Sequence, residues 1–285
     1  MKECMLYEAL DDKKVKCHAC AHRCTVFEDK TGICRVRKNI KGKLYSLVYG
    51  HPVVCAVDPV EKKPLYHFMP GIDVYSIGTV GCNFRCAFCQ NYDMVFSPDI
   101  IGKARSPRDV VDDALASGCE GIAYTYNEPG IFIEMVHDTA LLARERSLKN
   151  VMVTNGYMTV EALDSLSGLV DAMNVDLKSF NDSFYNKLCG ARLQPVLDCI
   201  RKAHSMGIHL EITTLVIPDE NDSEEELGKI ARFIASLDTG IPWHVSRFFP
   251  MHRMRDHDVT PIDTIRMACD IGKKEGLVNV HAGNI

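Results

Sequence analysis

Three cysteines in one short segment carry the strongest chemical signal of the sequence. Cys82, Cys86 and Cys89 follow the pattern Cys-x3-Cys-x2-Cys. Three thiolates in one loop can bind three irons of a cubane [4Fe–4S] cluster. The fourth iron then has no protein ligand, and a group bound there can receive an electron from the cluster. Zinc bound by these cysteines and one other ligand is the alternative, although zinc knuckles normally use paired cysteines.

A second group of four cysteines lies near the N-terminus. Its pattern is Cys-x2-Cys-x3-Cys-x9-Cys, and its members are Cys17, Cys20, Cys24 and Cys34. Four thiolates complete a tetrahedral zinc site, and we expect a structural zinc here. On spacing alone, an auxiliary [4Fe–4S] cluster without an open iron and a group without metal remain alternatives. Replacement of one cysteine by His18 or His22 also stays open.

The sequence contains thirteen cysteines in all, and the other six are scattered along it. In a reducing compartment cysteines stay as thiols and do not form disulfides. Isolated thiols are among the most frequently buried side chains. We therefore interpret the scattered set as structural: Cys4, Cys55, Cys119, Cys189, Cys199 and Cys269.

Composition excludes several classes of protein. The 285 residues are 46% hydrophobic and 25% charged, which is typical of a globular protein. The sequence has no apolar run of about 18 residues and no signal-peptide core at residues 1–10, so we expect a cytoplasmic protein without membrane association. The net charge of −5 and the shortness of the basic cluster at residues 35–43 argue against a nucleic-acid partner.

From residue 73 onward, short apolar runs alternate with helical patterns. The predicted strands are residues 74–80, 121–126, 151–154, 172–177, 210–216, 244–249 and 278–282. The predicted helices are residues 109–116, 131–146, 160–166, 196–206, 224–237 and 262–275. This alternation predicts an α/β fold, a partial or nearly closed TIM-type (βα)6 barrel followed by a seventh strand, with a doubly wound open sheet as the alternative.

Residues 1–72 do not alternate in this way. They contain the first cysteine group and a predicted hairpin around Lys41, Gly42 and Lys43. We expect two parts: a cysteine-rich N-terminal appendage over residues 1–72 and the barrel over residues 73–285. Neither of the glycine-rich nucleotide-binding motifs, GxGxxG and GxxxxGK[ST], occurs in the sequence. The sequence therefore does not indicate a nucleotide-binding Rossmann fold or a P-loop.

Polar motifs fall at the ends of successive predicted strands. They occupy residues 125–129, 154–157, 176–178, 213–218 and 247–252. In a barrel these ends converge on one mouth, where active sites lie. Glu128 can accept a hydrogen bond from an ammonium group and Lys178 can pair with a carboxylate, as a zwitterionic ligand requires. Taken singly, Asp176 and Lys178 could form an ordinary ion pair, and Asn155 could belong only to a turn.

The cysteine loop resembles the signature of the radical S-adenosylmethionine (SAM) superfamily. In that superfamily the aromatic residue before the third cysteine, here Phe88, lies near the adenine. The strand-end motifs look like those of the pyruvate formate-lyase activating enzymes. Asn127 and Glu128 stand where that family binds the methionine amino group, without its two glycines. Val153 stands where a monovalent-cation site has Asp, so we expect no such cation.

The resemblance implies a set of cofactor-binding residues at the barrel mouth. They are Phe88, Asn127, Glu128, Thr154, Asn155, Asp176, Lys178, Thr214 and His252. Across the whole chain, both cysteine groups, the Tyr-Asn-Glu-Pro segment and the Ser-Arg-Phe-Phe-Pro segment look like the AmmeMemoRadiSam-system radical SAM proteins. His244, Arg247 and Arg253 are candidates to face a substrate.

The implied activity is reductive cleavage of SAM to a 5′-deoxyadenosyl radical, which abstracts hydrogen from a substrate. A low-potential donor such as a ferredoxin or flavodoxin would supply the electron. One alternative is an enzyme that activates a glycyl-radical enzyme, whose substrate is a protein backbone. Another is a non-catalytic iron–sulfur electron carrier or metal-binding protein, although an electron carrier needs no zwitterion site.

Overall fold

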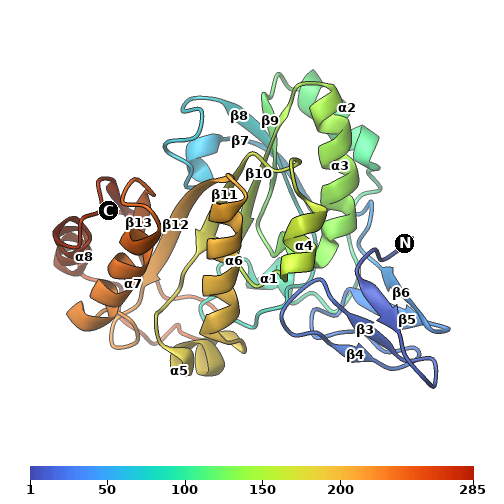
Figure 1. Ribbon diagram of the computed structural model, residues 1–285, viewed down its shortest axis with the longest axis horizontal. Coiled ribbons are helices and arrows are strands. Elements are labelled where there is room, and N and C mark those ends of the chain that lie inside the picture. The colour runs from blue at the N-terminus through green and yellow to red at the C-terminus, as the bar shows by residue number, and fades with distance from the viewer.

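The computed structural model describes residues 1–285, and an eight-stranded sheet forms its centre (Figure 1). The strands, in their order across the sheet, are β14 (Val280–Gly283), β13 (Trp243–Arg247), β12 (His209–Val216), β11 (Ala172–Asp176), β10 (Lys149–Thr154), β9 (Gly121–Tyr124), β8 (Asp73–Gly78) and β7 (Val54–Pro59). Strands β8 to β14 run parallel, and β7 joins the edge of β8 in the antiparallel direction. Because β7 and β14 do not pair, the sheet is open. The predicted partial barrel is therefore confirmed.

Strands β8 to β14 lie close to their predicted positions. Strand β7 was not predicted, because it lies in the segment 1–72 that does not show the alternating pattern. The main helices are α2 (Pro107–Ala116), α3 (Ile133–Glu145), α4 (Val160–Ser165), α6 (Leu193–Ser205), α7 (Glu224–Leu237) and α8 (Ile262–Lys274). None of them is long and apolar enough to cross a bilayer.

Local signals explain where several helices begin. Ser106 accepts a hydrogen bond from the N–H of Asp109, whose carboxylate bonds back to the Ser106 N–H, and this capping box starts α2. The Thr159 side chain caps α4 by accepting a hydrogen bond from the Ala162 N–H, and the Ser223 side chain caps α7 by accepting one from the Glu226 N–H. The short elements are α1 (Tyr92–Val95), α5 (Asp182–Phe184) and the turns η1 (Val60–Lys62), η2 (Pro129–Phe132) and η3 (Tyr185–Cys189).

A small apolar cluster closes the amino end of the barrel. It joins the segment 60–72 to the inner face of four neighbouring strands, and its members are Val60, Leu65, Ile72, Val74, Ala123, Val151 and Ala172. All seven side chains are buried. Because the amino end is filled, the carboxyl ends of the strands form the accessible mouth, where barrel enzymes carry their chemistry.

The N-terminal appendage consists of two small antiparallel sheets, which lie beside α3 and α4 (Figure 1). Its strands are β1 (Lys2–Glu3), β2 (Tyr7–Ala9), β3 (Val15–Cys17), β4 (Thr25–Val26), β5 (Arg37–Ile40) and β6 (Lys43–Ser46). The predicted hairpin joins β5 to β6, with Lys41 and Gly42 both at positive φ. Strand β7 belongs to the barrel sheet, so residues 54–72 extend the barrel and not the appendage.

Two close contacts attach the appendage to the barrel. The guanidinium of Arg37 on β5 donates to both carboxylate oxygens of Glu134 on α3, at 2.9 and 2.8 Å, and both side chains are fully buried. Gly81, just after β8, has φ +85°, and a Cβ there would lie 2.7 Å from the carbonyl oxygen of Cys34. Only glycine therefore allows the first cysteine group to approach the loop after β8 so closely.

The buried Arg37–Glu134 pair gives a stability prediction. Glu134→Gln leaves the Arg37 charge without its partner, so we expect the free energy of unfolding to fall by about 3–5 kcal/mol. In urea denaturation the free energy of unfolding should fall less in the double variant Arg37→Met/Glu134→Leu than in Glu134→Gln alone, because no unpaired charge remains. Lys43→Met, which breaks the exposed pair with Glu3, is the control and should change little. A double variant less stable than the single one would contradict this account.

Candidate active site at the carboxyl ends of the strands

The three cysteines of the first motif lie on the loop that follows β8. Their side chains are partly exposed at the barrel mouth. Backbone hydrogen bonds hold the loop from two sides: the N–H groups of Arg85 and Ala87 donate at 2.8 Å to carbonyls of residues 189 and 188, and the Arg253 N–H donates at 2.9 Å to the Ala87 carbonyl. Segments distant in sequence therefore position the thiols.

Asn127 fastens the start of this loop. Its amide nitrogen donates to the carbonyl of Gly81 at 2.8 Å and to the hydroxyl of Thr79 at 3.0 Å. Its amide oxygen accepts from the Thr79 N–H at 3.2 Å. The side chain thus binds the loop backbone, so its role in the structure is to position the cysteines.

A second network joins Glu128, Thr154 and Asn155. The buried carboxylate of Glu128 accepts from the Thr154 hydroxyl at 2.9 Å, the Asn155 N–H at 2.8 Å and the Gly130 N–H at 2.9 Å. The Asn155 amide in turn donates to the side-chain oxygen of Asn83 at 2.7 Å. It also lies 3.8 Å from the sulfur of Cys82. The strand ends of β9 and β10 are thereby linked to the cysteine loop.

Burial dominates the electrostatics of Glu128. Desolvation raises the pKa of its carboxyl to about 7, against the opposing effect of the Asn155, Gly130 and Thr154 donors. A carboxylate can accept about four hydrogen bonds, and three donors are present here. Glu128 therefore retains the capacity to accept from one more donor, such as an ammonium group.

Asp176 and Lys178 form an ion pair at the end of β11, with a distance of 2.8 Å between Nζ and Oδ2. Burial opposes the charge of Lys178, but attraction to Asp176 and to Cys86 outweighs it and holds the pKa of the lysine above its ordinary value. The ammonium also lies 5.7 Å from the ring centre of Phe88. Phe88 itself is buried and packs at 5.9 Å against Phe184.

Cys189 is a neighbour that the sequence does not reveal. Interaction with this nearby thiol lowers the pKa of Cys86 below its ordinary value, outweighing the burial that opposes ionisation. By contrast, burial raises the pKa of Cys82 well above its usual range and that of Cys89 to about 11. Cys189 lies about a hundred positions after Cys86, so no local spacing in the sequence indicates that the two are neighbours. From the sequence alone Cys189 is interpreted as an isolated structural thiol.

The two threonines of β12 face opposite sides of the sheet. The Thr214 hydroxyl donates to the Leu177 carbonyl at 2.8 Å and accepts from Trp243 Nε1 at 2.9 Å. Trp243 packs on Gly272 of α8, so Thr214, our predicted cofactor residue, points toward the helices. Thr213 faces inward by alternation, beside Asp176 in the register, and its buried hydroxyl oxygen has no partner.

His252 lies on the loop after β13. Its ring stacks on Tyr92 at 4.8 Å and on Phe96 at 5.3 Å, and its Nε2 is buried without a partner. Desolvation, together with Arg253 and Arg255, lowers the pKa of this histidine. The aromatic contacts fix the ring close to the segment that follows the cysteine loop.

A polar cluster around Glu211 lies deeper on the inner face of the barrel. The buried carboxylate accepts from the N–H groups of Tyr66 and His67, at 3.0 and 2.7 Å, and contacts His244 Nε2 at 2.6 Å. Burial alone would raise the pKa of Glu211, but its donors lower it to about 2. His244 thus bonds within the barrel, while Arg247 donates to the carbonyl of Thr260.

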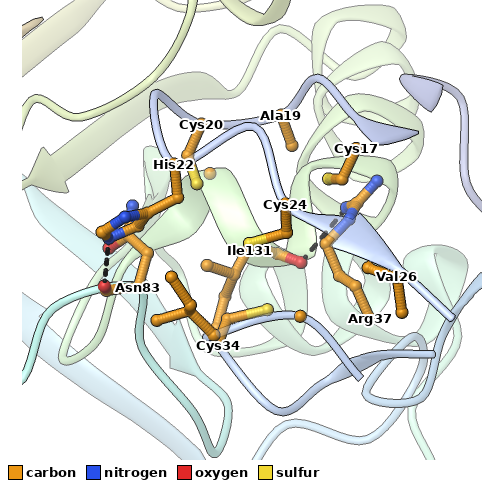
Figure 2. A pocket seen from close by; sticks show the side chains of 13 residues that line it. Cys17, Ala19, Cys20, His22, Cys24, Val26, Cys34, Arg37, Asn83 and Ile131 are labelled. Atoms are coloured by element: carbon orange, nitrogen blue, oxygen red, sulfur yellow. Dashed lines mark hydrogen bonds between the residues drawn. The ribbon is translucent and has the colours of Figure 1, made fainter. Parts of the chain in front are cut away.

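The first cysteine group lines one pocket between the appendage and the barrel. Figure 2 shows the sulfurs of Cys17, Cys20, Cys24 and Cys34 arranged around it. His22 also lines it, and its Nε2–H donates to the carbonyl of Asn83 at 2.8 Å. His18 does not line this pocket and bonds to Arg23.

Comparison with known proteins places these features in a family. Residues 76–234, more than half of the chain, match the radical SAM superfamily. The chain is 44% identical to an uncharacterized protein of Methanocaldococcus jannaschii, with all of this chain and 86% of that protein covered. It is 27% identical to the pyruvate formate-lyase-activating enzyme of Listeria monocytogenes, over 59% of this chain and 71% of that enzyme.

Solved structures show the same fold at low identity. Streptococcus suis SuiB bound to S-adenosylmethionine has a TM-score of 0.58 and 14% identity, covering 72% of this chain and 49% of that one. A domain of a pyruvate-formate lyase-activating enzyme from Bacteroides vulgatus has a TM-score of 0.50 and 20% identity, covering 57% and 99%. The chain belongs to the radical SAM superfamily, whose proteins bind a [4Fe–4S] cluster and S-adenosylmethionine.

Proposed function

We propose that this enzyme cleaves SAM reductively and uses the product to abstract hydrogen from a substrate at the barrel mouth. Cys82, Cys86 and Cys89 would hold the cluster. When bound, the cluster supplies the electron that converts SAM to methionine and a 5′-deoxyadenosyl radical. The observation that carries the proposal is the position of three thiols on one loop at the carboxyl ends of parallel strands, next to buried polar groups with spare bonding capacity.

Glu128 and Lys178 suit the two charges of the amino-acid part of SAM. Glu128 can accept one more hydrogen bond, here from the ammonium group, because only three donors engage its carboxylate. Lys178 keeps its positive charge beside Asp176 and can attract a carboxylate. Thr213 would offer its unpartnered hydroxyl on the inner face, in place of Thr214.

The other predicted residues would act by positioning these groups. Asn127 fixes the loop backbone, and Thr154 and Asn155 fix the Glu128 carboxylate. Phe88 packs on Phe184, and the ring of His252 stacks on Tyr92 and Phe96. This packing would limit the access of water to that side of the site, which strengthens the electrostatic interactions there.

The substrate has two candidate classes. Likeness to pyruvate formate-lyase activating enzymes favours the glycine backbone of a partner protein, although that likeness is 27% identity over 59% of the chain. A small molecule is the other class. We also propose a cytoplasmic location with a ferredoxin- or flavodoxin-like donor, since the cleavage consumes one low-potential electron.

The direct test is anaerobic turnover of the iron-loaded protein with dithionite and SAM. We expect methionine and 5′-deoxyadenosine from the wild type and neither product from Cys82→Ala. Cys269→Ala, which removes a buried thiol of α8 far from both cysteine groups in sequence, should retain activity. The proposal fails if the loaded wild type yields neither product, or if a different nucleoside appears.

The raised pKa of Glu128 predicts a pH-dependent affinity for SAM. An ammonium binds the ionised carboxylate, so below the pKa of about 7 each bound SAM must displace a proton. Affinity should therefore rise roughly tenfold per pH unit up to about pH 7 and then level off. Titration calorimetry in two buffers of different ionisation enthalpy should detect the released proton at pH 6. Glu128→Gln should bind more weakly and without this pH dependence; an unchanged slope would exclude the assignment.

The two threonines of β12 form a matched pair of variants. Thr213→Val should weaken SAM binding about 2–10-fold through loss of one hydrogen bond, without loss of stability, because its hydroxyl has no protein partner. Thr214→Val should cost about 1–3 kcal/mol of stability by leaving the Trp243 N–H unpaired, with SAM affinity unchanged. Calorimetry and urea denaturation separate the two effects. Weaker SAM binding in Thr214→Val, together with unchanged binding in Thr213→Val, would support Thr214 as the cofactor-binding residue instead.

A further inference from the structure

The pocket of the first cysteine group contains unpaired hydrogen-bond donors as well as four thiols. Arg37 and Asn83 line it, and they are 2% and 1% exposed. The Nε of Arg37 and the Nδ2 of Asn83 are buried with no hydrogen-bond partner. Unpaired buried donors are rare, and a group bound in the pocket is one ordinary explanation for them.

We propose that Cys17, Cys20, Cys24 and Cys34 bind a second [4Fe–4S] cluster. Four thiolates occupy all four irons, so this cluster would have no open position and would not bind SAM. A cubane also adds bridging sulfides, which accept hydrogen bonds. These sulfides and the thiolates are the acceptors that the Arg37 and Asn83 donors lack in the pocket (Figure 2).

The unpaired donors favour a cluster over a single zinc ion. A zinc ion adds no hydrogen-bond acceptor to the four thiolates, whereas a cubane adds its bridging sulfides. Two buried donors without a partner line the same pocket as the thiols, and a cubane gives them more acceptors than zinc does.

The second site is in direct contact with the loop of the first. Asn83 lines the cysteine pocket, follows Cys82 in the chain and accepts from Asn155 through its side-chain oxygen. Its carbonyl accepts from His22 Nε2–H at 2.8 Å. On the other side of Cys82, Gly81 lies against the backbone of Cys34. One short segment, residues 81–83, therefore separates the two proposed clusters.

The first experiment removes the loop cluster and asks what metal remains. The variant Cys82→Ala/Cys86→Ala/Cys89→Ala is purified and reconstituted anaerobically with iron and sulfide, and its iron, sulfide and zinc are measured. We expect about four irons and four sulfides per chain, against about eight of each in the wild type. Stoichiometric zinc without sulfide, or no metal at all, would overturn the proposal. Cleavage of SAM is not measured, so the result is independent of the proposed function.

Further variants assign the remaining iron to the pocket. Cys24→Ser, added to the triple variant, alters the least buried of the four thiols and should remove the iron and sulfide; circular dichroism checks that the fold remains. Adding Cys269→Ala instead, at a buried thiol outside both groups, should leave the metal content unchanged. A folded Cys24→Ser variant that keeps all its iron and sulfide would place the cluster elsewhere.

Proximity of the two sites has its own measurement. In the dithionite-reduced wild type, two paramagnetic clusters separated by residues 81–83 should broaden each other's electron paramagnetic resonance signals. The triple variant should show the narrower signal of one isolated cluster. A wild-type spectrum equal to the sum of two isolated signals would contradict the arrangement.

Discussion

The buried carboxylate of Glu128 is the interaction on which the geometry of the mouth depends. It follows β9 and receives donors from the end of β10 and from the short turn η2. Through Asn155 the same network reaches Asn83 in the cysteine loop. Burying a carboxylate is costly unless donors surround it, so these donors must stay where they are. The carboxylate therefore fixes the strand ends and the cysteine loop relative to one another.

The open barrel explains why the chemistry gathers at one end. Apolar side chains from residues 60–72 fill the amino end, and Glu211 ties the same segment to β12 through two backbone N–H groups. The inner face is left with polar groups that have no partner, among them Thr213. Because the amino end is filled, the proposed SAM and substrate sites lie together at the carboxyl ends of the strands.

The appendage packs directly against the barrel beside the loop that carries Cys82, Cys86 and Cys89. Its Arg37 is buried against Glu134 of α3, and Cys34 packs on Gly81 next to Cys82. Contacts of this kind are rigid, because a buried ion pair and a glycine without space for a Cβ both resist displacement. The first cysteine group is therefore held directly against the loop that would hold the catalytic cluster.

The sequence by itself determined the two cysteine groups, the alternation of strands and helices, and the polar motifs that meet at the strand ends. These are local patterns, which depend on spacing and on the period of each element. The sides of the sheet that Thr213 and Thr214 face, the proximity of Cys189 to Cys86 and the position of Asn83 between the two cysteine groups became visible only in the tertiary structure. Each depends on strand register or on packing between residues far apart in the chain. Neither register nor long-range packing can be read from a local pattern in the sequence.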